Sequence, residues 1–280
     1  MSLTLSRRTA LQKAIAGALG ALPVQGAWCA PRPEEFDFPL IDFHAHVEGD
    51  FKLLLALELA RSRGVKLGLA EHGGCGQKMN NDAALNSYLE EMAGAAVYKG
   101  MQAEGLDWMK CFSKNAIAQL DFVLSDALTF PEKDGHLVQL WTPAATIADK
   151  QDFMERYVAF NVRVISEEPI DIFANPTFLP EAIAAEYDKL WTKERMRRVI
   201  EAAVKNGVAI EINSRYDIPS LAFLRMAKEA GVKFSFGSNA HDENVGKLDY
   251  SLQMARELGL TRKNMFMPAP RAEKPIMRRD

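Results

Sequence analysis

From residue 40 almost to its end, the chain alternates between short apolar runs and longer segments whose apolar residues recur at helical spacing. The run 65–70, "VKLGLA", and the segment 51–64, "FKLLLALELARSRG", show the two kinds. Such alternation predicts an α/β fold in which helices cover a parallel sheet. About seven strand–helix units, without a recurring Gly-rich phosphate loop, favour a closed TIM-like barrel over an open doubly wound sheet.

The boundaries of the expected elements follow from the same periodicity and from Gly, Pro, Asn and Asp stops. We expect strands within 40–46, 65–72, 101–105, 121–128, 170–176, 208–215 and 232–241. We expect helices within 51–64, 81–100, 106–120, 149–167, 180–207 (one helix or a pair), 218–231 and 247–260. Residues 129–143 predict a hairpin with Asp134 and Gly135 at its turn.

The first thirty residues differ from the rest of the chain. A basic start precedes an Ala/Leu/Gly-rich stretch that is too short and too weakly apolar to span a membrane. The hexapeptide 6–11, "SRRTAL", resembles a twin-arginine export motif. We therefore expect an export signal at 1–30, a linker at 31–39, one barrel domain at 40–262 and a C-terminal tail at 263–280. An amphipathic helix of a cytosolic protein is the alternative for the first segment.

Charge and cysteine content exclude several classes of protein. Loss of residues 1–30 would remove three basic residues and no acid, so the formal charge would change from −3 to −6. A mildly acidic chain without a long basic run is a poor candidate for nucleic-acid binding. Cys75 and Cys111 remain, without a CxxC pair, so a disulfide scaffold is not expected. Cys75 is interpreted as a packing residue near the site, because no C-x5-R phosphate loop follows it.

Four of the five histidines lie at the predicted carboxyl ends of strands: His44, His46, His72 and His241. His44 and His46 are two residues apart, so on a strand their side chains point to the same face and could meet one cation. A single histidine is more often structural than a ligand. Four at equivalent strand ends of a barrel, where active sites of such folds lie, predict a metal site.

The motifs "DFHAH" (42–46), "AEHGG" (70–74) and "FGSNAH" (236–241) resemble, in order, the signature of the polymerase and histidinol phosphatase (PHP) domain family. The resemblance extends over about residues 40 to 260. It implies a distorted (β/α)7 barrel that holds up to three divalent ions, zinc, manganese or iron, for phosphoester hydrolysis. It also implies that His44 and His46 bind the first metal, that His72 and His241 bind another, and that Glu48 or Asp50 joins them.

The chain departs from the family pattern at four further positions that the resemblance places among the metal ligands. Gln102 stands where a Glu bridges two metals, Asn175 replaces a His, Asn239 replaces an Asp, and Asp126 lies near a position that is usually His. A neutral amide oxygen holds a divalent cation less strongly than a carboxylate does. We therefore expect one or two ions rather than three.

Hydrolysis by such a site would use water activated by the metal. Arg215, which follows the strand at 208–215, could hold a phosphate with two hydrogen bonds, although a solvated loop arginine is the plainer interpretation. Trp141 and Trp191 could stack on a substrate ring, but aromatic residues at this spacing are more often part of a core.

Three functions are compatible with these residues. The first is an exported metal-dependent phosphoesterase, periplasmic or secreted, whose partners are a small phosphorylated substrate and the twin-arginine export machinery, with no membrane contact once mature. The second is a PHP-like barrel that has lost catalysis and binds a ligand, as Gln102, Asn175 and Asn239 suggest. The third is an amidohydrolase-type barrel that cleaves C–N bonds. That superfamily also begins with HxH, but it normally has further histidines where this chain has Asp126 and Asn175.

Overall fold

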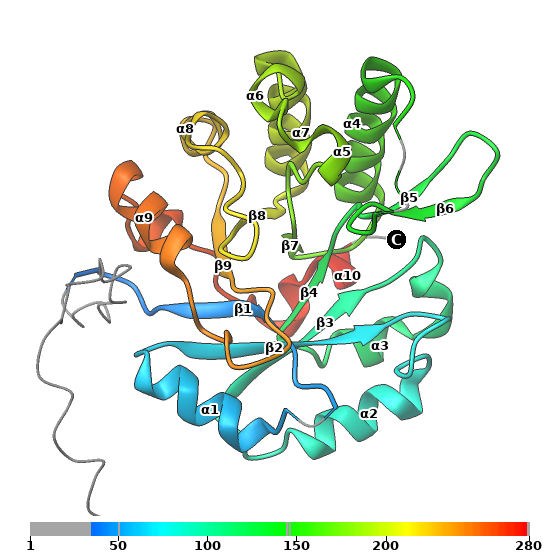
Figure 1. Ribbon diagram of the computed structural model, residues 1–280. Coiled ribbons are helices and arrows are strands. Elements are labelled where there is room, and N and C mark those ends of the chain that lie inside the picture. The colour runs from blue at the N-terminus through cyan, green and yellow to red at the C-terminus, as the bar shows by residue number, and fades with distance from the viewer. Residues whose placement is uncertain (1–34, 50, 144, 146, 279–280) are drawn as a thin grey trace, which may run out of the picture.

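The computed structural model describes residues 35–49, 51–143, 145 and 147–278 (Figure 1). The expected export signal, the first part of the expected linker and Asp50 lie outside the described residues. Among the helices of the described part, none has the length and apolar character needed to cross a membrane.

Seven parallel strands close into a barrel, in the order β1-β2-β3-β4-β7-β8-β9, with β9 pairing back to β1. The predicted α/β barrel is therefore confirmed. The strands are β1 (Ile41–Ala45), β2 (Lys66–Gly73), β3 (Val97–Ala103), β4 (Phe122–Ser125), β7 (Ile172–Phe173), β8 (Ala209–Asn213) and β9 (Phe234–Gly237).

Helices surround the barrel as expected (Figure 1). The longer ones are α1 (Leu53–Ser62), α2 (Asp82–Glu91), α4 (Lys150–Glu167), α7 (Lys193–Asn206), α8 (Leu221–Glu229) and α9 (Asp249–Leu258). Side-chain oxygens of Asn81, Asp149, Thr192 and Ser220 cap four of them at the N-terminus. The expected helix or helix pair at 180–207 is three helices, α5 (Glu181–Ala184), α6 (Tyr187–Leu190) and α7.

Two expected helices were wrong in extent. The helix predicted over 81–100 ends at Glu91, and β3 already begins at Val97, because residues 97–103 pair with β2. Helical spacing in this stretch is overridden by strand pairing in the tertiary fold. The segment 106–120 forms the short 3-10 helix η1 (Trp108–Cys111) and the short helix α3 (Lys114–Ile117).

A hairpin of β5 (Thr129–Pro131) and β6 (Leu137–Gln139) extends from the barrel after β4, as predicted (Figure 1). Gly135 has φ +85° at its turn, a conformation that glycine adopts without steric cost. His136 lies at this turn and is exposed, as its position in the sequence suggests.

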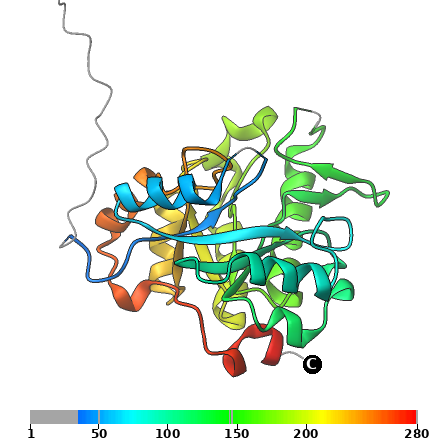
Figure 2. The same cartoon turned by 90° about the horizontal axis from the view of Figure 1, so that it is seen from below.

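Apolar side chains fill the barrel interior: Ile41, Phe43, Ala70, Phe122, Leu124, Ile172, Ala174 and Ala209. The C-terminal segment closes the end at which the strands begin. Met265 pairs with Phe234 at the start of β9, and the Phe266 ring packs against the Phe43 ring at 5.2 Å. Figure 2 shows this segment, in red, beneath the barrel. The residues expected to form a tail thus contribute to the core, and the polar residues gather at the opposite end.

Candidate metal centre

His46, Glu48, His72 and His241 lie together at the carboxyl ends of the strands, with one potential ligand atom from each within 4.8 Å of all the others. His46 and Glu48 follow β1, His72 lies on β2, and His241 follows β9. Because β1 is flanked by β2 and β9 in the barrel, the fold brings these three segments side by side. Three of the histidines that the sequence indicates and Glu48 therefore form one cluster.

The His46 ring lies between the other two histidine rings. Its centroid is 4.5 Å from that of His72 and 4.3 Å from that of His241, and both pairs are stacked. The side chain is buried, and neither ring nitrogen makes a hydrogen bond of ordinary geometry, although the Ala70 backbone lies nearby. Buried polar atoms are normally satisfied, so a metal ion is a fitting partner for His46.

Two carboxylates orient the histidines of the cluster. Glu48 lies 3.2 Å from Nε2 of His72 and 3.4 Å from Nδ1 of His241. Glu104, just beyond β3, lies 3.0 Å from Nδ1 of His72. Metal-binding histidines typically have such a carboxylate on the second ring nitrogen, which fixes the tautomer and the ring orientation. Glu104 was missed in the sequence, where its signal was its position immediately after a strand end.

The pKa values of the three histidines in the cluster are shifted in different directions. Burial lowers the pKa of His46 well below its ordinary value, and the neighbouring histidines add to this effect. Burial also lowers the pKa of His241. For His72 burial acts in the same direction, but the hydrogen bond and charge of Glu104 outweigh it and raise the pKa. At least His46 is therefore neutral at pH 7, which is the form that binds metal.

His44 lies outside the four-residue cluster. Its Nδ1 is 2.7 Å from Oε1 of Glu211, and its Nε2 is 3.0 Å from Oε1 of Gln102. Both histidine and glutamate are about 1% exposed. Burial acts to lower the pKa of His44, but the charge and hydrogen bond of Glu211, together with the charges of Asp126 and Asp42, raise it. The structure thus does not place His44 and His46 in the same set of converging ligand atoms. Gln102, which stands where the family resemblance implies a bridging Glu, contacts His44.

Asp126, Asn175 and Asn239, the remaining expected ligands, belong to a hydrogen-bonded network. Nδ2 of Asn175 donates to Asp126 at 2.8 Å. Oδ1 of Asn175 accepts from Asn213 at 3.0 Å and from Asn239 at 3.1 Å. Asn213 also donates to Glu211 at 3.0 Å. Burial, followed by the charge of Glu104, raises the pKa of Asp126 to about 6. These side chains bind one another, and Asp126, Asn175 and Asn239 line one cavity with His72 and His241.

Backbone conformation gives Asn175 and Asn239 a second role. Both have φ of +47°, in the left-handed region, where asparagine is among the few residues other than glycine that are enriched. The chain thus turns sharply at an asparagine after β7 and after β9, the two strands that flank β8. The amides therefore fit the backbone as well as the network.

A small cavity of about 190 Å³ opens over this end of the barrel. His72, His241 and Glu104 line it together with residues of the amide network, Trp141 and Arg215. Nη1 of Arg215 donates to the backbone oxygen of Asn239 at 2.8 Å, and the exposed guanidinium has further donors. Trp191, the other tryptophan considered in the sequence, is buried in the core.

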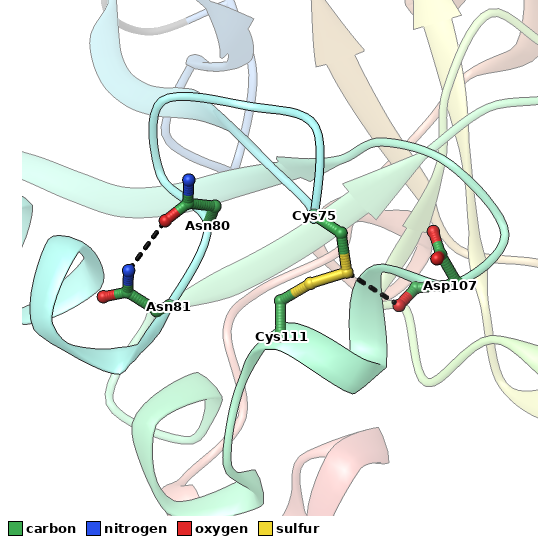
Figure 3. Close-up of a disulfide and its surroundings, with 5 residues drawn as sticks. All are labelled: Cys75, Asn80, Asn81, Asp107 and Cys111. Carbon is green, nitrogen blue, oxygen red and sulfur yellow. Dashed lines mark hydrogen bonds between the residues drawn. A yellow bond between two sulfur atoms is a disulfide. The ribbon is translucent and has the colours of Figure 1, made fainter.

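A disulfide joins Cys75, in the loop after β2, to Cys111 at the end of η1 (Figure 3). Cys75, interpreted from the sequence as a packing residue near the site, is thus also a disulfide cysteine. The two cysteines are 36 residues apart, but β2 and β3 are neighbours, which brings their Cα atoms to 5.5 Å. This disulfide is one bridge within the part of the chain that the structure describes, where an extensive apolar core is also present. Its position matters, because it ties together the two loops that follow His72 and Glu104.

Comparison with solved structures finds similarity to a crystal structure described as a "putative histidinol phosphatase" from Listeria monocytogenes. The TM-score is 0.57 and the sequence identity 14%, over 76% of this chain and 99% of the other. At this identity the likeness shows the fold alone, the closed α/β barrel. No family model and no curated protein matches the chain.

Proposed function

We propose that this chain is a metal-dependent hydrolase that cleaves phosphoesters, with a single divalent ion held by His46, Glu48, His72 and His241. The observation that carries the proposal is His46, a buried imidazole between two others with no ordinary hydrogen bond on either nitrogen. Two imidazoles with low pKa values and a carboxylate suit zinc, manganese or iron.

The chemistry divides between the ion and the residues around it. A divalent ion would lower the pKa of bound water towards 7 and polarise a phosphoryl oxygen. Arg215, at the edge of the cavity, would bind the phosphoryl oxygens through its remaining donors. Water adds to phosphorus, the bond from phosphorus to the ester oxygen breaks, and the alcohol leaves with a proton. Glu104, at Nδ1 of His72, would hold that ring in orientation and leave Nε2 for the ion.

Metal analysis of the purified full-length protein, together with a phosphatase screen in zinc, manganese or iron, tests this proposal. We expect one ion per chain, a number that follows from the single cluster found among the described residues. His46→Ala should lose the ion and the hydrolysis, whereas His136→Ala, in the exposed hairpin, should keep both. Absence of both bound metal and metal-stimulated hydrolysis would overturn the proposal.

A catalytically inactive binding protein is the second candidate, and the amide network favours it. Substitution of Gln102→Glu, Asn175→His and Asn239→Asp together discriminates between the two. If the network is part of a working site, the triple variant should lose hydrolysis, because Asn175 alone serves three partners. A large gain of hydrolysis would instead support degeneration from a site with more ions.

We also propose that the chain is exported to an oxidising compartment. The Cys75–Cys111 disulfide supports this, since such bonds persist mainly in secreted and periplasmic proteins. The resemblance of residues 6–11 to a twin-arginine motif is the other support. Fractionation of cells that express the full chain, compared with an Arg7→Lys/Arg8→Lys variant, tests it. We expect the variant to be retained in the cytoplasm, and equal distribution of both forms would contradict export by this route.

A further inference from the structure

A second cavity lies beside the proposed catalytic one, at the same end of the barrel. It has a volume of about 500 Å³, and its lining includes Phe178, Leu179, Tyr187, Tyr216, Ile218 and Tyr250, which we name the aromatic pocket. Its walls come from the segments that follow β7 and β8 and from the start of α9. Tyr216 lines both this pocket and the 190 Å³ cavity that contains Arg215. The two cavities are therefore adjacent across one side chain.

Aromatic and aliphatic side chains make up most of the pocket's lining. The Tyr250 hydroxyl donates to the Pro219 backbone oxygen at 2.6 Å. The Tyr187 hydroxyl lies 2.5 Å from the Thr177 hydroxyl and accepts from the Ser220 backbone at 3.2 Å. Since these two hydroxyls are used internally, what Tyr187 and Tyr250 offer a ligand is apolar ring surface suited to another ring.

The charges around the two cavities further limit the kind of ligand that they fit. Asp217 is the carboxylate among the pocket's lining residues, and burial raises its pKa, as does the charge of Asp249. A carboxylate at the edge disfavours a ligand group with its own negative charge. Arg215 provides the positive charge in the neighbouring cavity. The pair of cavities thus fits a molecule with an anionic end and an uncharged aromatic end.

Tyr216, the side chain between the two cavities, is held in place by Asn213 of the amide network and by Phe178. Oδ1 of Asn213 accepts from the backbone of Arg215 at 2.9 Å and of Tyr216 at 3.1 Å. The Tyr216 ring packs edge-on against Phe178 at 4.9 Å. Thr177 and Asp217 adopt φ of +63° and +53°, a strained conformation for residues other than glycine, of the kind found at ligand sites.

We propose that the aromatic pocket binds the uncharged aryl group of the phosphoester, so that the preferred substrates are aryl or arylalkyl monophosphates. This proposal rests on the proposed function for the phosphate end only. The aryl end can be tested separately, because an uncharged aromatic probe needs neither metal nor hydrolysis.

The experiment uses p-cresol as a probe of the pocket in the full-length protein, with binding measured by saturation-transfer NMR with and without metal. We expect binding under both conditions, and a loss of it in Tyr250→Leu but not in Val204→Ala, a matched apolar truncation on exposed α7 surface. Thermal melting of both variants checks that they are folded. If p-cresol does not bind, or binds folded Tyr250→Leu as well as it binds the unchanged protein, the proposed aromatic site is overturned whatever the metal content.

A second measurement connects the pocket to the phosphate site. With the metal-loaded protein, phenylphosphonate should inhibit hydrolysis about tenfold more strongly than methylphosphonate, in line with the stabilisation that an aromatic contact provides. Equal inhibition would overturn the assignment of the pocket to the substrate. Binding of p-cresol to a protein with neither metal nor hydrolysis would refute the proposed function while leaving the aromatic site in place.

Discussion

Nδ1 of His44 lies 2.7 Å from Oε1 of Glu211, and both side chains are buried inside the carboxyl end of the barrel. Burial acts to raise the pKa of Glu211, but the charge and hydrogen bond of His44, together with hydrogen bonds from Asn175 and Asn213, lower it, while Glu211 acts to raise the pKa of His44. Each side chain therefore favours the charged form of the other. Gly237 makes room for the pair, because a Cβ at that position would lie 1.9 Å from Oε1 of Glu211.

Glu211→Gln should destabilise the fold by about 3 kcal/mol, because removing one partner of a buried ion pair leaves the other uncompensated. Glu211 also accepts from the backbone of Asn175 at 2.7 Å, which a glutamine oxygen can satisfy only at the expense of its other contacts. Urea unfolding measures the loss. Glu201→Gln, on the exposed face of α7, is the control. Equal stability of the two variants would show that the pair contributes little.

Glu104→Gln should weaken metal binding about 10- to 100-fold, as loss of a carboxylate behind a metal-binding histidine typically does. The substitution keeps the size of the side chain but removes the charge that raises the pKa of His72. Titration of the metal-free protein with zinc, followed by calorimetry, measures the change. Glu90→Gln, exposed on α2, should bind zinc as the unchanged protein does. Unchanged zinc affinity in Glu104→Gln would exclude its role in orienting His72.

The sequence contains enough information to predict the barrel and the location of the polar residues. Strand–helix alternation predicts the fold, and polar residues at the carboxyl ends of parallel strands are expected to meet. This is why His46, His72 and His241 could be predicted to lie close together although they are far apart in the chain.

The sequence does not predict which of these side chains contact one another. Glu211 lies in the apolar run "AIEIN" (209–213) without a motif. Only its position on the same strand face as Ala209 and Asn213, two residues away on either side, indicates that it points into the barrel. His44 pairs with it instead of joining His46, and the pairing of β1 with β2 is irregular between Asp42 and Ala45. Such departures from regular pairing depend on tertiary packing, which spacing alone does not encode.

Removal of the disulfide, by Cys75→Ser/Cys111→Ser, should lower the free energy of unfolding by about 2 to 4 kcal/mol, because the bridge closes a loop of 36 residues in the unfolded chain. The loops after His72 and Glu104 should also become less restrained, so zinc should bind more weakly. Thermal melting and zinc titration, with and without a thiol reductant, measure both effects. The unchanged protein should respond to reductant and the double variant should not. A melting temperature insensitive to reductant in both would contradict the prediction.

Asp171 should make stability depend on pH at a position distant from the metal centre. Its side chain accepts from the Val123 backbone at 2.9 Å, and burial raises its pKa from 3.8 to about 6, although the charges of Lys274 and Arg278 oppose this. Between these two pH values the folded state holds a proton that the unfolded state has released. The folded state is therefore favoured at low pH, and stability falls as pH rises from about 4 to 6.

Asp171→Asn removes this titration and keeps an oxygen that can accept from Val123. The variant should therefore gain stability relative to the unchanged protein as pH rises, by roughly 1 to 3 kcal/mol at pH 7.5. At pH 4 the two should be nearly equal, since the carboxyl group is then protonated in the folded state. Urea unfolding of both proteins at several pH values between 4 and 7.5 measures the difference. A constant difference across this range would mean that Asp171 does not titrate there.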